Sequence, residues 1–435
     1  DLSITDCVFM LNTGNVLGGY QSNSSADITI LNSIIWNNTI IGNSFNNINV
    51  SVSYSCVEGS YSGTGNTNLL PQFCNPFEYP LTLSSSSPLI GVGWFNENIG
   101  GLDTSCEIPT STFYISSNGS MNGLGTEPMP LLSIQKTIDG ISIGDTVLIA
   151  PGVYEENIDI IDKNITLGSY FITTQDTNYI AQTVIKGALN INVLDSTSYF
   201  GGFSFKDNPN GLDITDSDGL HISHLNIENT PGLHITTSNV HLSESIVFNN
   251  YERSNNQGGG LNIDNSFVEL VNMVIDSNRT NNGYPGAGIR STHSTVIMDS
   301  IQVTRNYTSS VSYSGNGGGI YFYSDGTGDD SLHISNSIIK YNRSGNGGGL
   351  YAQAGAVTLN NVTIDSNQAY QGGAVYGINN DYTPFNAYNS SFNYNNHTRE
   401  IAGGYGGGIY FSGSGLLSLE YCVIQHNKSY DRGGG

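Results

Sequence analysis

The sequence predicts an all-β fold, a right-handed parallel β-helix in which short strands stack into a solenoid. A phrase recurs through the second half of the chain: alternating apolar segments that end on Asn, a polar turn, then Gly-Gly-Gly or a close variant before another apolar segment. The apolar positions alternate with period two and are Val, Ile, Thr, Tyr and Phe, which indicates strands rather than helical repeats. The anchoring asparagines are Asn278, Asn306, Asn342, Asn367, Asn395 and Asn427.

Stacking explains how such short strands bury their apolar side chains. Each strand pairs with its counterpart one coil along, roughly 4.8 Å away. In-register stacking places like residues over like, so we expect the anchoring asparagines to form a ladder of side-chain hydrogen bonds. The tyrosine of the Gly-Gly-Gly-Ile-Tyr phrase is expected to pack as a stacked row in the same way.

Composition and charge exclude several classes of function. The 435 residues contain 13 Lys and Arg against 36 Asp and Glu, a net charge of −23. A chain this acidic is a poor partner for nucleic acid or an anionic membrane, because both need a basic patch. The sequence has no run of eighteen apolar residues, so we expect no membrane span in it. The hydrophobic content of 37 % is too high for a disordered acidic chain.

Residues 245–435 carry the Gly-Gly-(Gly/Ala)-apolar-Tyr phrase and the apolar-x-x-Asn phrase, and in this they resemble the repeats of chlamydial polymorphic membrane proteins. Those proteins are surface adhesins with a β-helical outer part. The resemblance implies a cell-surface or extracellular location and an adhesive role.

The first 160 residues resemble secreted pectin-lyase-like β-helix proteins in two places. The phrase Ser87-Pro-Leu-Ile-Gly91 is similar to the closing coil of that family, and residues 113–160 are similar to its amino-terminal cap. Leu131, Ile134 and Ile138 fall on one face of a short helix that would cover the open end of the first coil.

We therefore expect two β-helix modules in tandem. Residues 1–101 form the C-terminal coils of a first module, residues 102–112 a linker or cap, and residues 113–435 a second module. Within the second module, 113–160 are the cap and first coils, and 245–435 the regular repeats. Because both ends fall inside repeat-like segments, we also expect this sequence to be one window of a longer polypeptide, with self-association or covalent tandem copies end to end.

Some proteins with this fold are enzymes, so residues that could form a catalytic site must be considered. The strongest candidates for binding a metal are Asp213, Asp216 and Asp218, near His221 and the histidines that follow it, and the Asp216-Ser-Asp-Gly turn could hold Ca²⁺. No Lys or Arg lies between Lys206 and Arg253 to bind an acidic sugar or act as a base. We therefore expect these carboxylates to cap turns and the histidines to lie on solvated strands, with no catalytic residues and no cofactor other than calcium. The alternative is a polysaccharide lyase or hydrolase, or a carbohydrate-binding protein.

Asn-x-Ser/Thr sequons are frequent, and those at exposed corners are expected to carry glycans. An asparagine inside a ladder, in contrast, cannot be glycosylated. The candidate positions are Asn278, Asn306, Asn342, Asn396, Asn427, Asn37 and Asn164.

The five cysteines are sparse, and no Cys-x-x-Cys pair suggests a zinc site. Cys56 and Cys74 flank a Gly/Ser/Asn-rich loop, so we expect a disulfide between them; the alternative is that one of them pairs with Cys106. Together, these features predict a structural or adhesive extracellular rod that forms part of a surface fibre or filament.

Overall fold

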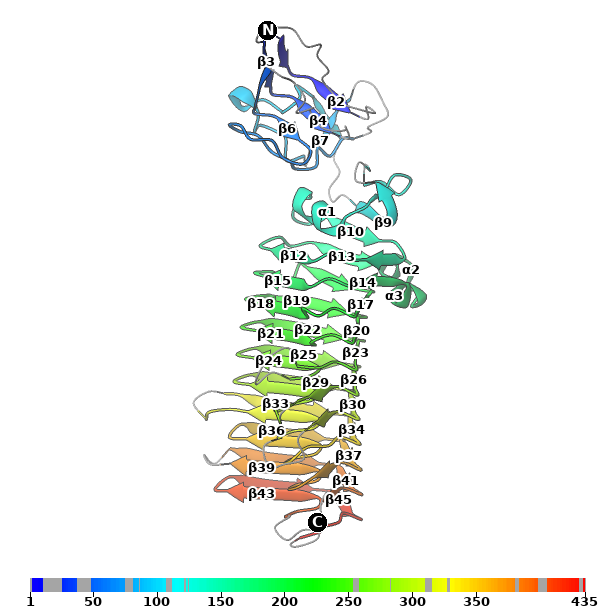
Figure 1. Ribbon diagram of the computed structural model, residues 1–435. Helices are drawn as coiled ribbons and strands as arrows, with labels where there is room; N and C mark the ends of the chain where they lie inside the picture. The colour runs from blue at the N-terminus through cyan, green and yellow to red at the C-terminus, as the bar shows by residue number, and fades with distance from the viewer. Residues whose placement is uncertain are drawn as a thin grey trace. The chain divides into compact units, whose positions relative to one another are not determined.

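The computed structural model describes most of the 435 residues (Figure 1). The described residues are 2–10, 26–36, 48–74, 81–85, 87–106, 112–120, 123, 125–252, 258–281, 283–309, 315–326, 329–379, 383–397, 405–429 and 433–434. They divide into two compact units: residues 1–150 with 165–167, and residues 151–164 with 168–435. None of the described helices is long and apolar enough to cross a membrane.

Three long parallel sheets, here called sheets A, B and C, contain most of the strands (Figure 1). Sheet A has twelve strands: β9 (Thr112–Ser120), β10 (Thr146–Ile149), β13 (Thr166–Ser169), β16 (Tyr199–Gly201), β19 (Asp218–Ser223), β22 (Asn239–Ser243), β25 (Phe267–Val271), β29 (Thr295–Asp299), β33 (Ser331–Ser335), β36 (Ala356–Asn360), β40 (Pro384–Tyr388) and β44 (Leu416–Glu420).

Sheets B and C follow the same stacking order. Sheet B has eleven strands: β11 (Gly152–Tyr154), β14 (Thr183–Ile185), β17 (Ser204–Lys206), β20 (Asn226–Glu228), β23 (Ile246–Phe248), β26 (Val274–Asp276), β30 (Gln302–Thr304), β34 (Ile338–Lys340), β37 (Thr363–Asp365), β41 (Ser391–Asn393) and β45 (Val423–Gln425). Sheet C has ten: β12 (Ile158–Ile161), β15 (Leu189–Asn192), β18 (Leu212–Thr215), β21 (Leu233–Thr236), β24 (Leu261–Asp264), β28 (Ile289–Thr292), β32 (Ile320–Tyr323), β35 (Leu350–Gln353), β39 (Val375–Asn379) and β43 (Ile409–Gly413). The prediction of an all-β parallel β-helix is confirmed.

Smaller elements complete the fold. In the first unit, β1 (Leu2–Thr5), β3 (Ala26–Leu31) and β5 (Ile48–Ser53) form one parallel sheet, β2 (Val8–Met10), β4 (Ile34–Trp36) and β6 (Cys56–Val57) a second, and β7 (Leu83–Ser84) and β8 (Thr104–Cys106) a third. Short ladders join β27 (Arg279–Thr280) to β31 (Tyr307–Thr308) and β38 (Gln368–Ala369) to β42 (Asn396–His397). The helices are η1 (Trp94–Asn96), α1 (Ile134–Gly140), α2 (Phe171–Thr174) and α3 (Asn178–Gln182).

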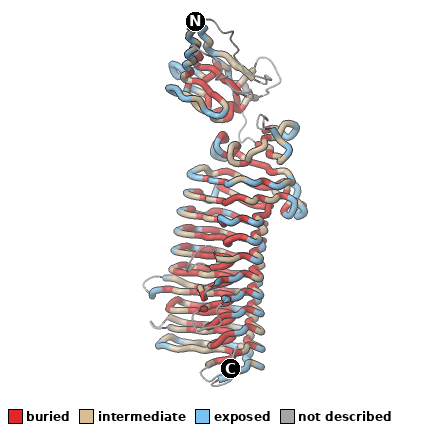
Figure 2. Tube along the Cα trace, viewed as in Figure 1, coloured by how far each residue is buried: buried red, intermediate tan, exposed pale blue. Residues whose placement is uncertain are grey.

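The core of the second unit is a set of apolar columns inside the coils, which Figure 2 shows as buried stretches repeated along the chain. Strand alternation explains the columns: in β21, Leu233 and Ile235 are fully buried, and they stack on Leu261 and Ile263 of β24. Because each coil buries its side chains only against the next coils, stability is expected to come mainly from nearest-neighbour stacking.

The predicted short helix is confirmed as α1. Ser133 caps its N-terminus by accepting a hydrogen bond from the backbone N–H of Lys136. Ile134 and Ile138 are buried on one face of this helix, whereas Leu131 is buried but precedes the N-cap and lies outside α1. The division into two tandem modules at 102–112 stays a prediction.

The asparagine ladder is also confirmed, and it corrects part of the glycosylation prediction. Asn278, Asn306 and Asn342 are 0 % exposed. The Nδ2 group of each donates to the asparagine of the next coil and to a backbone carbonyl oxygen. The folded chain leaves no room for a glycan on these three amides, so glycosylation there was a wrong prediction.

The other predicted glycosylation positions differ in accessibility. Asn427 ends the ladder and is half-buried; its Nδ2 donates to Phe392 O at 2.7 Å. Asn164 and Asn396 are also half-buried, and glycosylation at these three positions stays a prediction. Asn37 lies outside the described residues.

The cysteines do not pair as predicted. Cys74 is disulfide-bonded, whereas Cys7, Cys56 and Cys422 are free thiols, so the predicted Cys56–Cys74 bridge is wrong. The reason is that Cys56 is a core residue: it stacks on Ile34 and is 0 % exposed. This burial, together with the charge of Glu58, raises the pKa of the Cys56 thiol. The side chain of Cys106, the alternative partner, lies outside the described part of the chain.

Candidate functional site

The outer face of sheet C carries a row of side chains that we call the polar column. In each strand of this sheet the first and third residues are mostly buried, so the second residue points outward. These second residues stand in register from coil to coil. In stacking order they are Asp159, Asn190, Asp213, His234, Asn262, Arg290, Tyr321, Tyr351, Tyr376 and Tyr410.

Asp213 and His234 form the first side-chain contact in the middle of the column. His234 Nδ1 lies 3.4 Å from Asp213 Oδ1, and its Nε2 lies 3.2 Å from the backbone oxygen of Pro231. Only 5 % of His234 is exposed, and its two ring nitrogens face the Asp213 carboxylate and the Pro231 carbonyl group. A third of the Asp213 side chain remains open to solvent, which leaves its carboxylate accessible to a ligand.

Arg290, two coils further on, is the cation of the column. Its Nη1 donates to Asn262 Oδ1 at 3.2 Å and to Thr292 Oγ1 at 3.1 Å. Burial lowers the pKa of Arg290, and the nearby charges of Asp264 and Tyr321 act in the opposite direction. Thr292 in turn donates to Asp264, which links the guanidinium to that carboxylate through a neutral hydroxyl group.

The Arg290 guanidinium also holds an unused donor. Its Nε–H is buried and has no hydrogen-bond partner within the described residues. An arginine has five N–H donors in a fixed planar fork, and leaving one buried and unpaired is unfavourable.

The rest of the column is a tyrosine stack. The ring centroids of Tyr321 and Tyr351 are 5.1 Å apart, those of Tyr351 and Tyr376 are 5.3 Å apart, and those of Tyr376 and Tyr410 are 4.8 Å apart. All three pairs are stacked, as predicted from the repeat phrase. Because the ring faces contact one another, they are not available as a platform for a sugar ring; edges and hydroxyl groups remain.

The three aspartates proposed as metal ligands do not converge. Asp213 belongs to sheet C, Asp216 accepts a hydrogen bond from Thr237 at a turn, and Asp218 begins β19 of sheet A and accepts from Asn239 Nδ2 at 3.1 Å. Across the described ranges there is no group of three or more His, Cys, Asp or Glu residues placed to hold a metal ion. The carboxylate of Asp216 contacts the next coil, and its turn-capping role stays a prediction.

The histidines of the same segment separate onto different faces. His221 and His241 lie one coil apart on the outer face of sheet A, with tilted rings whose centroids are 5.6 Å apart, and His241 Nδ1 lies 3.1 Å from Glu269 Oε2. His234 belongs to sheet C, beside Asp213. The candidate cluster therefore contributes only Asp213 and His234 to the polar column.

Arg290 was not predicted from the sequence, because it is far from Asp213 along the chain. The residue lies 77 positions later, yet the coils bring it into the same column. A signal was present, because the four central column residues each follow a Gly-apolar pair: Gly-Leu-Asp213, Gly-Leu-His234, Gly-Leu-Asn262 and Gly-Ile-Arg290. Aligning these triplets would have placed the four side chains together.

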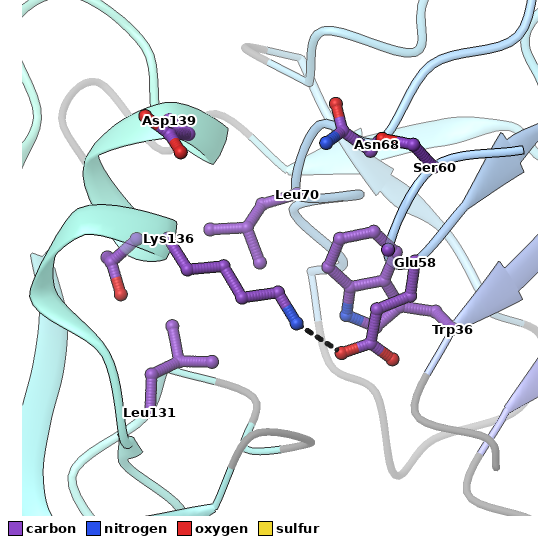
Figure 3. Close-up of a pocket in the computed structure, with 10 residues that line it drawn as sticks. Trp36, Glu58, Ser60, Asn68, Leu70, Leu131, Lys136 and Asp139 are labelled. Atoms are coloured by element: carbon purple, nitrogen blue, oxygen red, sulfur yellow. Dashed lines mark hydrogen bonds and ion pairs between the residues drawn. The ribbon is translucent and has the colours of Figure 1, made fainter. Parts of the chain in front are cut away.

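The first unit contains a separate pocket of about 200 Å³, shown in Figure 3. Its apolar wall includes Leu70 and Leu131, and an ion pair joins Lys136 Nζ to Glu58 Oε1 at 2.8 Å. The other residues that line it are Trp36, Gly59, Ser60, Asn68, Thr137 and Asp139. This volume is below the several hundred cubic ångströms of a pocket for a drug-sized ligand, and the ion pair already satisfies its central charges.

No protein-family model matches the sequence, and no curated protein matches it. Solved structures similar to the chain include a rhamnogalacturonan lyase, with 14% identity, a TM-score of 0.35 and coverage of 69% of this chain and 84% of that one. The pectate lyase Pel9A shows 12% identity, a TM-score of 0.35 and coverage of 74% and 79%.

A third similar structure is the A-module of the mannuronan C-5 epimerase AlgE4 from Azotobacter vinelandii, with 12% identity, a TM-score of 0.32 and coverage of 67% and 91%. None of these three is a polymorphic membrane protein, and that resemblance stays a prediction. The long parallel sheets themselves establish the β-helix.

Proposed function

We propose that this protein is an extracellular β-helix that binds a neutral polysaccharide along the polar column, with the segment from Asp213 to Arg290 at the centre of the site. The observation that carries the proposal is the in-register row of a carboxylate, an imidazole, an amide and a guanidinium on one face of sheet C. Carboxylate, amide and guanidinium groups are the planar hydrogen-bonding groups that pair with sugar hydroxyl groups.

The repeat of the coils suits a linear ligand. Each coil advances the column by roughly 4.8 Å, so a chain lying along it meets a new polar side chain at every coil. A polyanionic chain is disfavoured, because the protein carries a net charge of −23. The ligand class that fits both features is an uncharged polysaccharide.

Binding can be tested with purified protein and soluble neutral polysaccharides such as β-glucan, mannan and xylan. We expect Arg290→Gln and Asp213→Asn to weaken binding by about tenfold or more, since hydrogen bonds to charged groups contribute about 1.5–3 kcal/mol. Lys206→Gln is the matched control: Lys206 is a surface cation on sheet B, paired with Glu228 at 3.1 Å. Unchanged affinity in both column variants would contradict the proposal.

The same samples separate binding from catalysis. Incubation with neutral and acidic polysaccharides, followed by measurement of reducing ends and of unsaturated products, reports hydrolysis and elimination respectively. A binding protein leaves chain length unchanged. Product formation that is lost in Arg290→Gln would make the column the active site of an enzyme.

A structural role is the second candidate, and the buried asparagine ladder favours it. Side chains such as Asn306 and Tyr351 are engaged by neighbouring coils and strengthen the stack, with no ligand needed. A surface fibre or adhesive stalk would use that strength. Electron microscopy of native material distinguishes the two candidates, because a structural fibre should appear as filaments and a soluble binding protein as separate particles.

A further inference from the structure

Two histidines and a glutamate form a row on the outer face of sheet A, on a different sheet from the polar column. His221 of β19 pairs in register with His241 of β22, and Glu269 of β25 follows in what we call the histidine row (Figure 1). In-register pairing places these side chains on one face, roughly 4.8 Å apart from coil to coil. His221 is exposed, and His241 and Glu269 are half-buried, so the row is open to solvent.

Glu269 orients the ring of His241. The Oε2 atom of Glu269 lies 3.1 Å from His241 Nδ1. An ionised carboxylate can only accept a hydrogen bond, so this contact places the proton of a neutral His241 ring on Nδ1. The other ring nitrogen, Nε2, then carries the lone pair that can bind a metal ion. Histidines that bind metal ions almost always have a carboxylate, carbonyl or water partner at their second ring nitrogen.

His221 supplies a second imidazole beside the first. The ring centroids of His221 and His241 are 5.6 Å apart, and the ring planes are tilted by 49°. Two imidazole nitrogens bound to one tetrahedral zinc ion lie roughly 3.3 Å apart, because each Zn–N bond is about 2.0–2.1 Å. Within the described part of the chain, the ring nitrogens of His221 have no hydrogen-bond partner. Turning this exposed ring onto an ion therefore breaks no hydrogen bond.

The surroundings of the row favour a cation. No Lys or Arg occurs between Lys206 and Arg253, the stretch that contains both histidines, and the chain carries a net charge of −23. Tyr199 precedes His221 in the row, and its hydroxyl group is hydrogen-bonded to Ser223 Oγ at 2.7 Å. Tyr199 therefore borders the site and is not one of its ligands.

We propose that His221 and His241 bind a divalent transition-metal ion of the Zn²⁺, Cu²⁺ and Ni²⁺ class, with Glu269 as a positioning residue. Imidazole nitrogens favour these ions, whereas Ca²⁺ and Mg²⁺ prefer oxygen ligands. The described residues offer no group of three or more side-chain ligands, so water molecules complete the coordination. A site with two protein ligands is open and binds its ion reversibly. The inference does not depend on ligand binding by the polar column.

Isothermal titration calorimetry of the full chain with ZnCl₂ tests the site. His221→Thr and His241→Thr should each weaken the tightest binding by about tenfold or more, as changes around metal sites do. Threonine suits a strand, and Thr358 already occupies the same row. His333→Thr is the matched control: His333 is exposed in the same row, but its neighbours there are Ile297 and Thr358, so its loss should leave the affinity unchanged.

The role of Glu269 has its own test. Glu269→Ala should weaken Zn²⁺ binding by about 10–100-fold, the range found for the partners of metal-binding histidines. Glu269→Gln retains an oxygen that accepts from His241 Nδ1 and should recover part of that affinity. Equal affinities of the alanine and glutamine variants would contradict a positioning role.

Cu²⁺ provides a spectroscopic measurement of the ligands. The electron paramagnetic resonance spectrum of Cu²⁺ bound to the wild-type chain should show coupling to two imidazole nitrogens, and the spectrum of His241→Thr should lose it. Circular dichroism confirms that each variant is folded. The proposal is overturned if the wild-type chain binds no Zn²⁺, if both histidine variants bind it as tightly as the wild type, or if the Cu²⁺ spectrum shows no nitrogen coupling.

Discussion

Asn278 and Asn306 lie one coil apart and are joined twice: the backbone N–H and the side-chain Nδ2 of Asn278 both donate to Asn306 Oδ1, each at 2.9 Å. The backbone N–H and the Nδ2 group of Asn306 donate in the same way to Asn342 Oδ1. The side chain of each ladder asparagine therefore satisfies two buried backbone groups of the preceding coil, as Asn306 does for the Asn278 N–H and the Ile275 carbonyl oxygen.

Replacing Asn306 with alanine should be strongly destabilising. The change leaves the Asn278 N–H and the Ile275 carbonyl oxygen buried without their partners. Each buried unsatisfied group costs about 1–3 kcal/mol, so the free energy of unfolding should fall by about 3 kcal/mol or more. Urea unfolding followed by circular dichroism measures the loss.

The control for this experiment is Asn239→Ala. Asn239 is exposed and makes a single side-chain hydrogen bond, to Asp218 Oδ1 at 3.1 Å. Its loss should change the free energy of unfolding by less than about 0.5 kcal/mol. Equal effects of the two substitutions would show that the ladder adds nothing beyond an ordinary surface contact.

A second prediction concerns the tyrosine stack. Tyr351 is 5 % exposed, and its ring stacks on the rings of Tyr321 and Tyr376. Tyr351→Ala should therefore lower the free energy of unfolding by about 3–5 kcal/mol, as for other buried aromatic residues. Tyr351→Phe keeps the stack and removes the hydrogen bond from Tyr351 OH to Gln353 Oε1 at 2.8 Å, a loss of about 1 kcal/mol. Tyr341→Phe, at a side chain 60 % exposed, should change little, and thermal unfolding compares all three.

The contacts that repeat from coil to coil could be predicted from the sequence. The ladder asparagines and stacked tyrosines hold a fixed place in every repeat, so in-register stacking predicts their contacts directly. The polar column is harder to predict, because the turns vary in length: the ladder spacing is 28 residues from Asn278 to Asn306, but 36 from Asn306 to Asn342. Arg290 joins Asp213 and His234 only once the coils are aligned.

Burial explains the two wrong predictions. A sequon is defined by three residue types alone. It therefore cannot show that the side-chain amide of Asn278 is buried and already hydrogen-bonded. The loop flanked by Cys56 and Cys74 suggested a bridge, but stacking turns the Cys56 side chain into the core beside Ile34. In both cases the deciding contact is with another coil, far from the residue in sequence.

A third prediction follows for the thiols. At low protein concentration, iodoacetamide should label Cys7 and Cys422, which are partly exposed, and should not label Cys56. Burial blocks access to Cys56, and its raised pKa keeps the thiol protonated and unreactive. Peptide mass spectrometry before and after unfolding in guanidinium provides the measurement and its control; rapid labelling of Cys56 in the folded chain would contradict its place in the core.

The last prediction is a loss of stability at mildly acidic pH through His224. This residue follows β19 at a left-handed turn, with φ of 54°; its Nδ1 lies 2.9 Å from Ser223 Oγ, and its ring centroid lies 4.3 Å from that of Phe171. Burial lowers the pKa of His224, and the charge of Glu244 partly opposes this. A histidine with a lowered pKa binds its proton more weakly when the chain is folded than when it is unfolded.

The sign of the effect is fixed by that difference. As the pH falls below about 6.5, the usual histidine pKa, the unfolded chain takes up a proton that the folded chain does not. The free energy of unfolding should therefore fall with pH down to the folded pKa of His224, by at most about 1.4 kcal/mol per pH unit for one proton. His224→Asn suits the left-handed backbone and lacks this proton. Urea unfolding of both proteins between about pH 5 and pH 8 isolates the contribution, and identical pH profiles would exclude it.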